Sequence, residues 1–176
     1  MLTYAFFSAY SSISVLKSLR SFVLMHGGCS ALLQAMKCAE DRDELALTFE
    51  ILKVLSRNVD CSIEFARLDA CQLVVSHMNS SFQDILVVVC SALNNLMKGT
   101  NDNVNTVVSC GGFEALLTLM ISMSTNENLI FASCVSIASA LQNKNAFYKL
   151  KSLHLKSLLG IMLEVLTMLV LLHISI

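Results

Sequence analysis

One apolar pattern occurs four times in this chain at a constant interval, and it restricts the possible folds more than any other feature. Its copies are Gly28 to Met36, Ala70 to Met78, Gly112 to Met120 and His154 to Met162, each 42 positions after the one before. Each copy has two adjacent apolar residues and a methionine three positions further on, which places all three on one stripe of a helix. A fixed interval of about 20 to 50 residues predicts a repeat protein, in which every unit is buried against its neighbours.

The equivalent positions of these copies form three columns along the sequence. The columns are Leu32, Val74, Leu116 and Leu158; Leu33, Val75, Leu117 and Leu159; and Met36, Met78, Met120 and Met162. A single methionine usually fills a gap in a core. Methionine at four equivalent positions indicates one packing environment that is used four times.

Two further kinds of helix are expected between these copies. Long helices are predicted at 42–57, 81–99 and 125–143, because each range begins with polar capping residues and continues as an apolar run. Short helices are predicted at about 61–68, 104–110 and 146–153, each after a polar break. No strand-like alternation competes with them. The sequence therefore predicts an all-α fold with three helices in each repeat unit.

Composition agrees with a packed helical array. Hydrophobic residues make up 55% of the chain, charged residues only 14%, and there is no proline and little glycine to form a linker. We expect a single domain over residues 1–176, with units at 28–69, 70–111 and 112–153, a partial unit at 1–27 and a partial or truncated one at 154–176.

The sequence resembles the armadillo repeat family. The segments that carry the likeness are Met25 to Leu33, Cys110 to Leu117 and Ala92-Leu93-Asn94-Asn95-Leu96. Gly27-Gly28 and Gly111-Gly112 look like the turn that precedes the second helix of such units, and Asp69-Ala70 stands at the equivalent place in between. The likeness covers roughly residues 17–162. It implies an armadillo-type α-solenoid, a right-handed superhelix of three-helix repeats.

The resemblance also implies where a partner would bind. The third helices of armadillo repeats line the concave surface, and here they would be 42–57, 81–99 and 125–143. Equivalent positions on them hold Lys53, Asn95 and Ser139, which we take as candidate partner-binding residues. Lys53 would meet an acidic group, Asn95 can donate and accept hydrogen bonds at once, and Ser139 leaves room for a partner. The alternative is that Asn95 and Ser139 satisfy local backbone groups and Lys53 is solvated.

Other classes of function find little support in the sequence. The net charge of −1 and the lack of a basic stripe argue against nucleic acid as a partner. Seven cysteines form no Cys-x-x-Cys pair, and no His lies at metal-ligand spacing from them. No catalytic Ser, His and Asp pattern or His-Glu-x-x-His is present. We therefore expect a non-enzymatic protein without metal or cofactor, whose partner is a protein or a peptide.

The C-terminal segment allows two interpretations. Residues 157–176 contain Glu164 and His173 but no Lys or Arg, and are just long enough to span a bilayer. However, the first half of this segment continues the repeat pattern, and Glu164 would be costly in lipid. We expect an exposed end of the solenoid, with a membrane anchor as the alternative.

Three hypotheses about function follow. The first is a protein-interaction scaffold, which could be part of a longer repeat array. The second is an adaptor attached to a membrane through 157–176, and the third is a transport-receptor-like binder of basic peptides. Reduced cysteines indicate the cytoplasm. A weaker similarity of Ile51 to Ile63 and Ser76 to Asn79 to armadillo-like proteins of cilia and flagella implies an association with the cilium.

Overall fold

The computed structural model describes residues 22–79, 82–122 and 125–152. Within these ranges the chain is helical, with no strand. The helices recur in the order that the sequence predicts, and the fold is all-α. The fourth copy of the apolar pattern, the segment 157–176, and most of the partial unit 1–27 lie outside the described residues.

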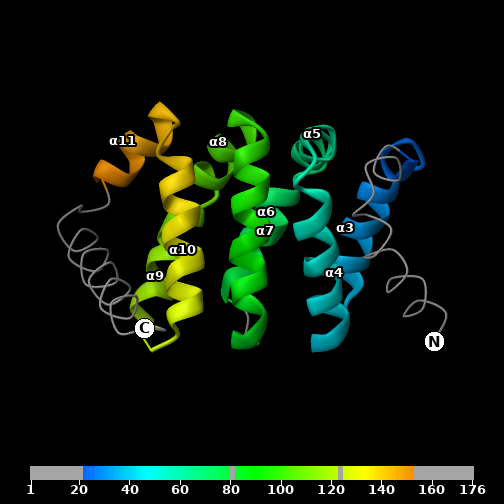
Figure 1. Cartoon of the computed structure of the whole chain (residues 1–176), viewed down its shortest axis with the longest axis horizontal. Helices are drawn as coiled ribbons and strands as arrows, with labels where there is room; N and C mark the ends of the chain where they lie inside the picture. The colour runs from blue at the N-terminus through cyan, green and yellow to red at the C-terminus, as the bar shows by residue number, and fades with distance from the viewer. Residues whose placement is uncertain (1–21, 80–81, 123–124, 153–176) are drawn as a thin grey trace, which may run out of the picture.

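Three long helices stand side by side as one layer (Figure 1). They are α4 (Arg42–Leu55), α7 (Leu86–Gly99) and α10 (Glu127–Ala140). The central helix α7 packs against both of the others, and its contact with α10 is the largest between any two described helices. These three helices carry all the candidate partner-binding residues.

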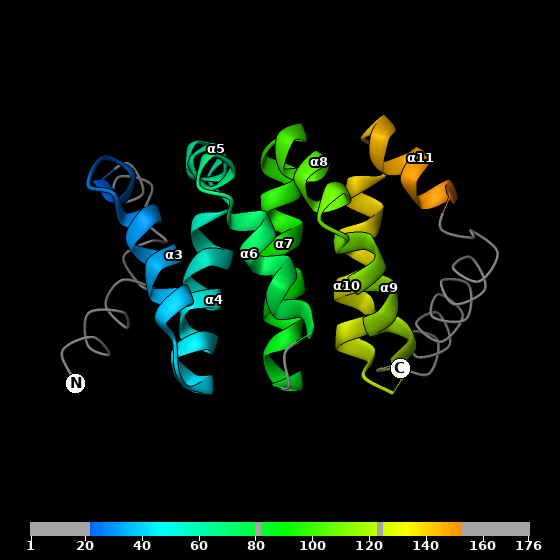
Figure 2. The ribbon, with the colours of Figure 1, turned by 180° about the vertical axis from the view of Figure 1, so that it is seen from behind.

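The remaining helices form a second layer and one end of the molecule. Behind the long helices lie α3 (Gly28–Cys38), α6 (Ala70–Ser76) and α9 (Gly112–Ser122) (Figure 2). The short helices α5 (Val59–Arg67), α8 (Asn101–Ser109) and α11 (Lys144–Ser152) lie at the end where the long helices finish. Two 3-10 turns, η1 (His77–Asn79) and η2 (Gln83–Ile85), link α6 to α7.

Side chains cap the N-termini of two of the three long helices and of the short helices α5 and α8. Asp41 and Asn126 accept hydrogen bonds from the first turns of α4 and α10, while Asn58 and Thr100 do the same for α5 and α8. The short helices therefore begin slightly earlier in the chain than predicted. The exception is α7, which follows η2 without a side-chain cap.

The described parts of the three predicted columns are largely buried in one core. Met36, Met78 and Met120 are each at most 1% exposed. In the other two columns Leu32, Val74, Leu116, Leu33 and Val75 are also buried, and Leu117 is partly buried against the core. This burial confirms the one-stripe interpretation for the three copies that the structure describes.

The turn before each second-layer helix has the same left-handed backbone. Gly27, Asp69 and Gly111, which occupy equivalent positions in successive units, have φ values of 70°, 56° and 81°. Glycine adopts this conformation without steric cost, and Asp is among the few other residues that tolerate it. The turn is therefore kept in the middle unit, although the glycine pair is absent there.

Gly112, the second glycine of the pair Gly111-Gly112, allows the start of α9 to lie close to Val107 of α8 and Val75 of α6. A Cβ on Gly112 would lie 2.5 Å from Val107 Cγ1 and 3.1 Å from Val75 Cγ2. The equivalent position in the preceding unit holds Ala70, which is fully buried. The turn before α6 therefore has room for the methyl group of Ala70, whereas the turn before α9 has no room for one at Gly112, although the two turns share one backbone conformation.

Hydropathy identifies no complete membrane-spanning helix in the described ranges. The bent pair α8 and α9, which meet at 69°, reaches the length and composition of a broken span.

Candidate partner-binding site

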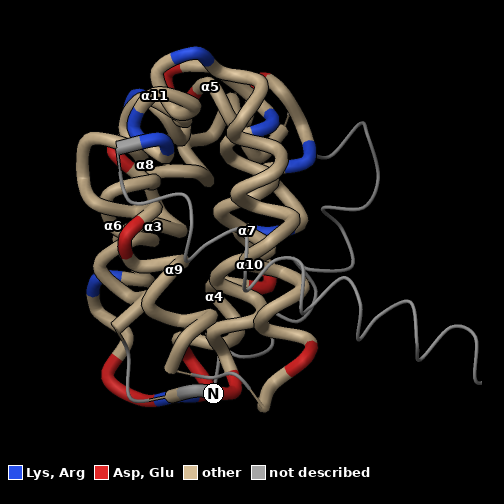
Figure 3. Tube along the Cα trace, turned by 90° about the vertical axis from the view of Figure 1, so that its left-hand side faces the viewer, with Lys and Arg blue, Asp and Glu red and all other residues tan. Residues whose placement is uncertain are grey.

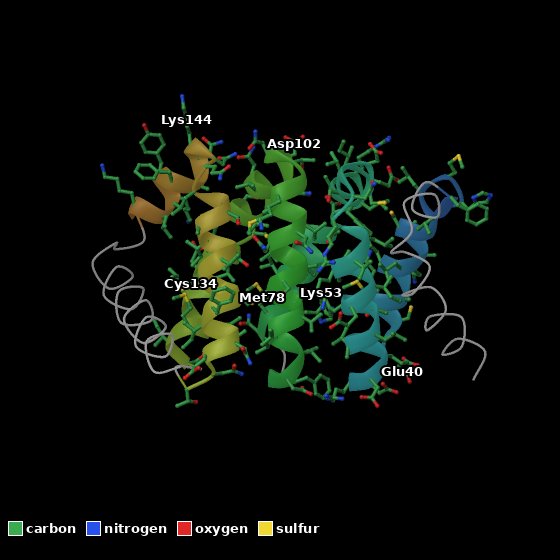
Figure 4. All side chains as sticks on the ribbon, in the orientation of Figure 1. Glu40, Lys53, Met78, Asp102, Cys134 and Lys144 are labelled. Carbon is green, nitrogen blue, oxygen red and sulfur yellow. The ribbon has the colours of Figure 1, made fainter. Side chains whose placement is uncertain are left out.

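The three predicted residues lie on the layer of long helices, one on each. Lys53 is on α4, Asn95 on α7 and Ser139 on α10, and each is partly buried. Figure 4 shows Lys53 on the face formed by α4 and α7. The ammonium group of Lys53 forms an ion pair with Glu50, one turn earlier on the same helix. Lys53 is therefore already engaged with a carboxylate of its own helix.

The structure brings two of the three residues into direct contact. Asn95 Nδ2 donates a hydrogen bond of 2.9 Å to the backbone carbonyl of Lys53, at the equivalent position of the preceding unit. This bond joins α4 to α7 and occupies part of the amide that was expected to meet a partner. The bond links two units of the array, and the role of Asn95 in binding a partner stays a prediction.

Two hollows open between the C-terminal ends of the long helices. The first has a volume of about 200 Å³ and lies between the ends of α4 and α7, and the second has about 280 Å³ and lies between the ends of α7 and α10. The first is lined by Ser56, Arg57, Val59, Asn95, Lys98 and Gly99. Asn95 therefore borders the first hollow, Ser139 borders the second, and Lys53 borders neither.

The two hollows are equivalent places in successive units. The first hollow has Asn95 where the second has Ser139, 44 positions later, and both hollows share Lys98 and Gly99. Lys98 corresponds to Gln142 at the same interval, whereas Arg57 corresponds to Gly99, because each directly precedes the residue that caps the next short helix, Asn58 or Thr100. The first hollow is consequently lined by two cations, Arg57 and Lys98, whereas the second is lined by Lys98 alone among the charged residues.

The charged groups of the molecule are unevenly distributed between its two ends, although acidic residues such as Asp60 and Asp102 also lie in α5 and α8. Lys and Arg gather towards the end with α5 and α11, and Asp and Glu gather at the opposite end (Figure 3). At the acidic end, Asp43 and Glu44 lie in the first turn of α4, where the positive end of the helix dipole favours them. The hollows lie at the basic end.

Sequence reasoning missed Arg57 and Lys98. Both side chains are exposed, and neither forms an ion pair within 4.0 Å among the described residues. They lie 41 positions apart, Arg57 in the turn after α4 and Lys98 in α7, so only packing places them at one hollow. The sequence feature that pointed to this region was the column of equivalent positions that contains Asn95 and Ser139, since each of these residues borders a hollow.

Asn103, which the sequence analysis did not single out, links four helices through buried hydrogen bonds. It is fully buried, and its Nδ2 donates to the carbonyls of Leu96 at 2.8 Å and Ser62 at 3.3 Å. Its Oδ1 accepts from the thiol of Cys71 at 3.3 Å. These bonds tie α8 to α7, α5 and α6, and they give Asn103 a structural role.

Burial shifts the pKa values of one histidine and of several thiols among the described residues. His77 packs edge-on against Phe49, and burial lowers the pKa of its imidazole. Burial raises the pKa of the Cys71 thiol to about 12 and that of Cys90 to about 11, so both remain protonated at neutral pH. In the described part of the chain, no group of three His, Cys, Asp or Glu residues could hold a metal ion.

Comparison with known proteins supports the fold alone. No family model matches the chain, and no curated protein matches it. It is similar to the crystal structure of an engineered protein determined by the Northeast Structural Genomics Consortium, with a TM-score of 0.74 at 16% sequence identity. The match covers 82% of this chain and 58% of that structure, so the chain spans little more than half the length of its structural neighbour.

Proposed function

We propose that this chain is an armadillo-type interaction module that binds an extended segment of a partner protein across the C-terminal ends of α4, α7 and α10. The observation that carries the proposal is the pair of equivalent hollows in successive units. Equivalent hollows at a regular interval suit an extended peptide, which presents side chains at regular intervals.

The chemistry of the lining residues supports the same function. Their side chains supply amide, hydroxyl and cationic groups, which can hydrogen-bond to a peptide backbone or to polar side chains. The lining residues include no histidine, cysteine or carboxylate, and these are the groups that a hydrolytic or metal-dependent site needs. Binding is therefore the activity that fits these hollows.

A plug in the second hollow tests the proposal. Ser139 contributes none of the side-chain hydrogen bonds that join the described helices, so Ser139→Trp fills the hollow without removing such a bond. The matched control is Ser30→Trp, at an exposed position of α3 in the other layer. A random peptide library would be selected on the wild-type chain, and each selected peptide would be measured against both variants.

We expect the selected peptides to bind Ser30→Trp as they bind the wild type, and to bind Ser139→Trp at least about tenfold more weakly. A tenfold loss corresponds to about 1.4 kcal/mol of binding free energy. Both variants would first be compared with the wild type for helicity and melting temperature. If every selected peptide bound Ser139→Trp with unchanged affinity, the proposed site would be rejected.

A further inference from the structure

The first hollow has two cations and no carboxylate. Arg57 follows the end of α4, Lys98 lies in the last turn of α7, and both line the hollow beside the amide of Asn95. The five ion pairs in the described ranges involve other residues, as do the hydrogen bonds of charged side chains. Two cationic groups therefore face one small space without a counter-charge among its described lining residues.

The helix dipole accounts for only part of this arrangement. A cation near the last turn of a helix is stabilised by the partial negative charge of the free carbonyls. That effect favours a cation at each helix end, but it does not bring both cations to one hollow. The nearest acids along the chain, Asp60 and Asp102, lie in the first turns of α5 and α8 and are not lining residues.

We propose that the first hollow binds the carboxylate of an acidic residue in the partner segment. In this arrangement Arg57 and Lys98 donate charge-assisted hydrogen bonds to the carboxylate. The second hollow, where Lys98 is accompanied only by uncharged residues such as Asn101 and Gln142, receives an uncharged polar side chain. The inference rests on the proposed function, and it specifies the chemistry of the partner.

The distance between the hollows gives the spacing of these two side chains. Packed helices lie about 8 to 10 Å apart, and the hollows occupy successive gaps between long helices. An extended chain rises about 3.3 Å per residue. The acidic residue and the polar residue are therefore about three positions apart in the partner.

The same charges disfavour a partner rich in Lys and Arg. A basic side chain in the first hollow would meet two like charges, and like-charge contacts across an interface cost free energy. The preference for an acidic segment thus opposes the hypothesis of a receptor for basic peptides.

The test uses the full chain and three fluorescein-labelled peptides of about a dozen residues. All three peptides consist mainly of Ser and Thr, which suit an extended conformation. In the first peptide every third residue is alternately Glu or Gln. The second and third peptides replace every Glu by Gln or by Lys. Fluorescence anisotropy would give the Kd of each peptide at low and at high salt, because added salt screens exposed charges.

The decisive variant removes both cations from the first hollow. Arg57→Asn combined with Lys98→Gln replaces them with amides, and Lys98→Gln also removes the one charged residue that lines the second hollow. The control combines Lys37→Gln with Lys151→Gln, which removes the same charge from exposed lysines that form no ion pair among the described residues. A general effect of net charge would appear equally in both variants.

We expect the Glu peptide to bind the wild type and the control alike, and to bind Arg57→Asn/Lys98→Gln about tenfold more weakly. High salt should reduce its affinity, and the Lys peptide should not bind. If the Gln peptide bound the wild type as well as the Glu peptide and was blocked by Ser139→Trp, the peptide site would stand and the acidic preference would be wrong. Equal loss of Glu-peptide binding in both double variants would also overturn the inference, as would failure of all three peptides to bind.

Discussion

Two equivalent junctions in successive units join a short helix to the second-layer helix that follows, and they achieve the same geometry with different residues. The first junction runs through Asp69 and Ala70, the second through Gly111 and Gly112. Both turn through a left-handed residue, with φ values of 56° and 81°. The backbone conformation is thus common to the two units, whereas the way in which each junction is packed is not.

The residues that follow the two turns show the difference most clearly. After the first turn, Cys71 donates its thiol hydrogen bond to buried Asn103. After the second turn, the equivalent residue is Phe113, whose side chain is fully buried. In α11 the position equivalent to Asn103 holds Ala146, which is also fully buried, and the neighbouring Asn145 is exposed and donates to Asn105 at 3.1 Å. One junction is held by a polar network, and the other by an aromatic side chain.

The largest expected effect comes from removing the aromatic side chain. Phe113→Ala should lower the free energy of unfolding by about 4 kcal/mol, because it deletes a fully buried ring and leaves a cavity. Cys71→Ala, at the equivalent position, should cost only about 1 kcal/mol. Urea denaturation followed by circular dichroism measures both values. Equal losses would mean that the two junctions are stabilised in the same way.

The polar network should make buried Asn103 respond differently from Asn145, an exposed asparagine of α11. Asn103→Ala should cost about 3 kcal/mol, since it leaves the carbonyls of Leu96 and Ser62 buried without this donor. Asn145→Ala should change stability by less than about 0.5 kcal/mol, because that side chain is exposed. Thermal unfolding of the two variants compares them directly. Similar melting temperatures would contradict a network confined to the first junction.

Exchanging the small residues of the two turns tests the difference in space. Gly112→Ala should destabilise the fold by about 2 kcal/mol, because the new Cβ would overlap with the side chain of Val107. Ala70→Gly should cost about 1 kcal/mol through backbone entropy and the loss of a buried methyl group. An increase in stability of Gly112→Ala, measured by urea denaturation, would show that Val107 moves aside at little cost.

Substitutions of the left-handed residues Gly111 and Asp69 should give the smallest changes in the free energy of unfolding, and the two changes should have opposite signs. Gly111→Ala should cost about 1 kcal/mol, since a Cβ is unfavourable at this φ. Asp69→Gly should stabilise the fold by about 0.5 kcal/mol by removing a Cβ from the same conformation, less the entropy that glycine adds to the unfolded chain. Differential scanning calorimetry resolves shifts of this size. Destabilisation by Asp69→Gly would show that the Asp side chain supports the turn.

The helices and much of the core were predictable because their signals are local. A helix that is buried on one side repeats its apolar residues with the helical period, so the columns that contain Met36 and Leu32 identified core positions directly. The polar starts of α4 and α10 were recognisable for the same reason, since a cap acts within one turn. The glycine pairs also indicated their turns, and the regular repeat interval placed Asp69 in the same column.

The candidate site could be located from the sequence, but its chemistry could not be assigned. Asn95 and Ser139 were predicted from one column, and each borders a hollow. Lys53 belongs to the same column, yet it borders neither hollow and pairs with Glu50. Position along a helix does not determine whether a side chain faces a hollow or a neighbouring charge, because that depends on the adjacent helix.

By itself, the sequence determined which segments are helical, which stripe of each is buried and how often the pattern returns. Only the tertiary structure decided that Arg57 and Lys98 share a hollow, that Asn103 is buried while Asn145 is exposed, and that Asn95 bonds to the preceding long helix. The physical reason is the distance along the chain over which each interaction acts. Helix periodicity and capping act within a turn or two of the chain, whereas these contacts join side chains from different repeat units, and their partners are chosen by the packing of successive units.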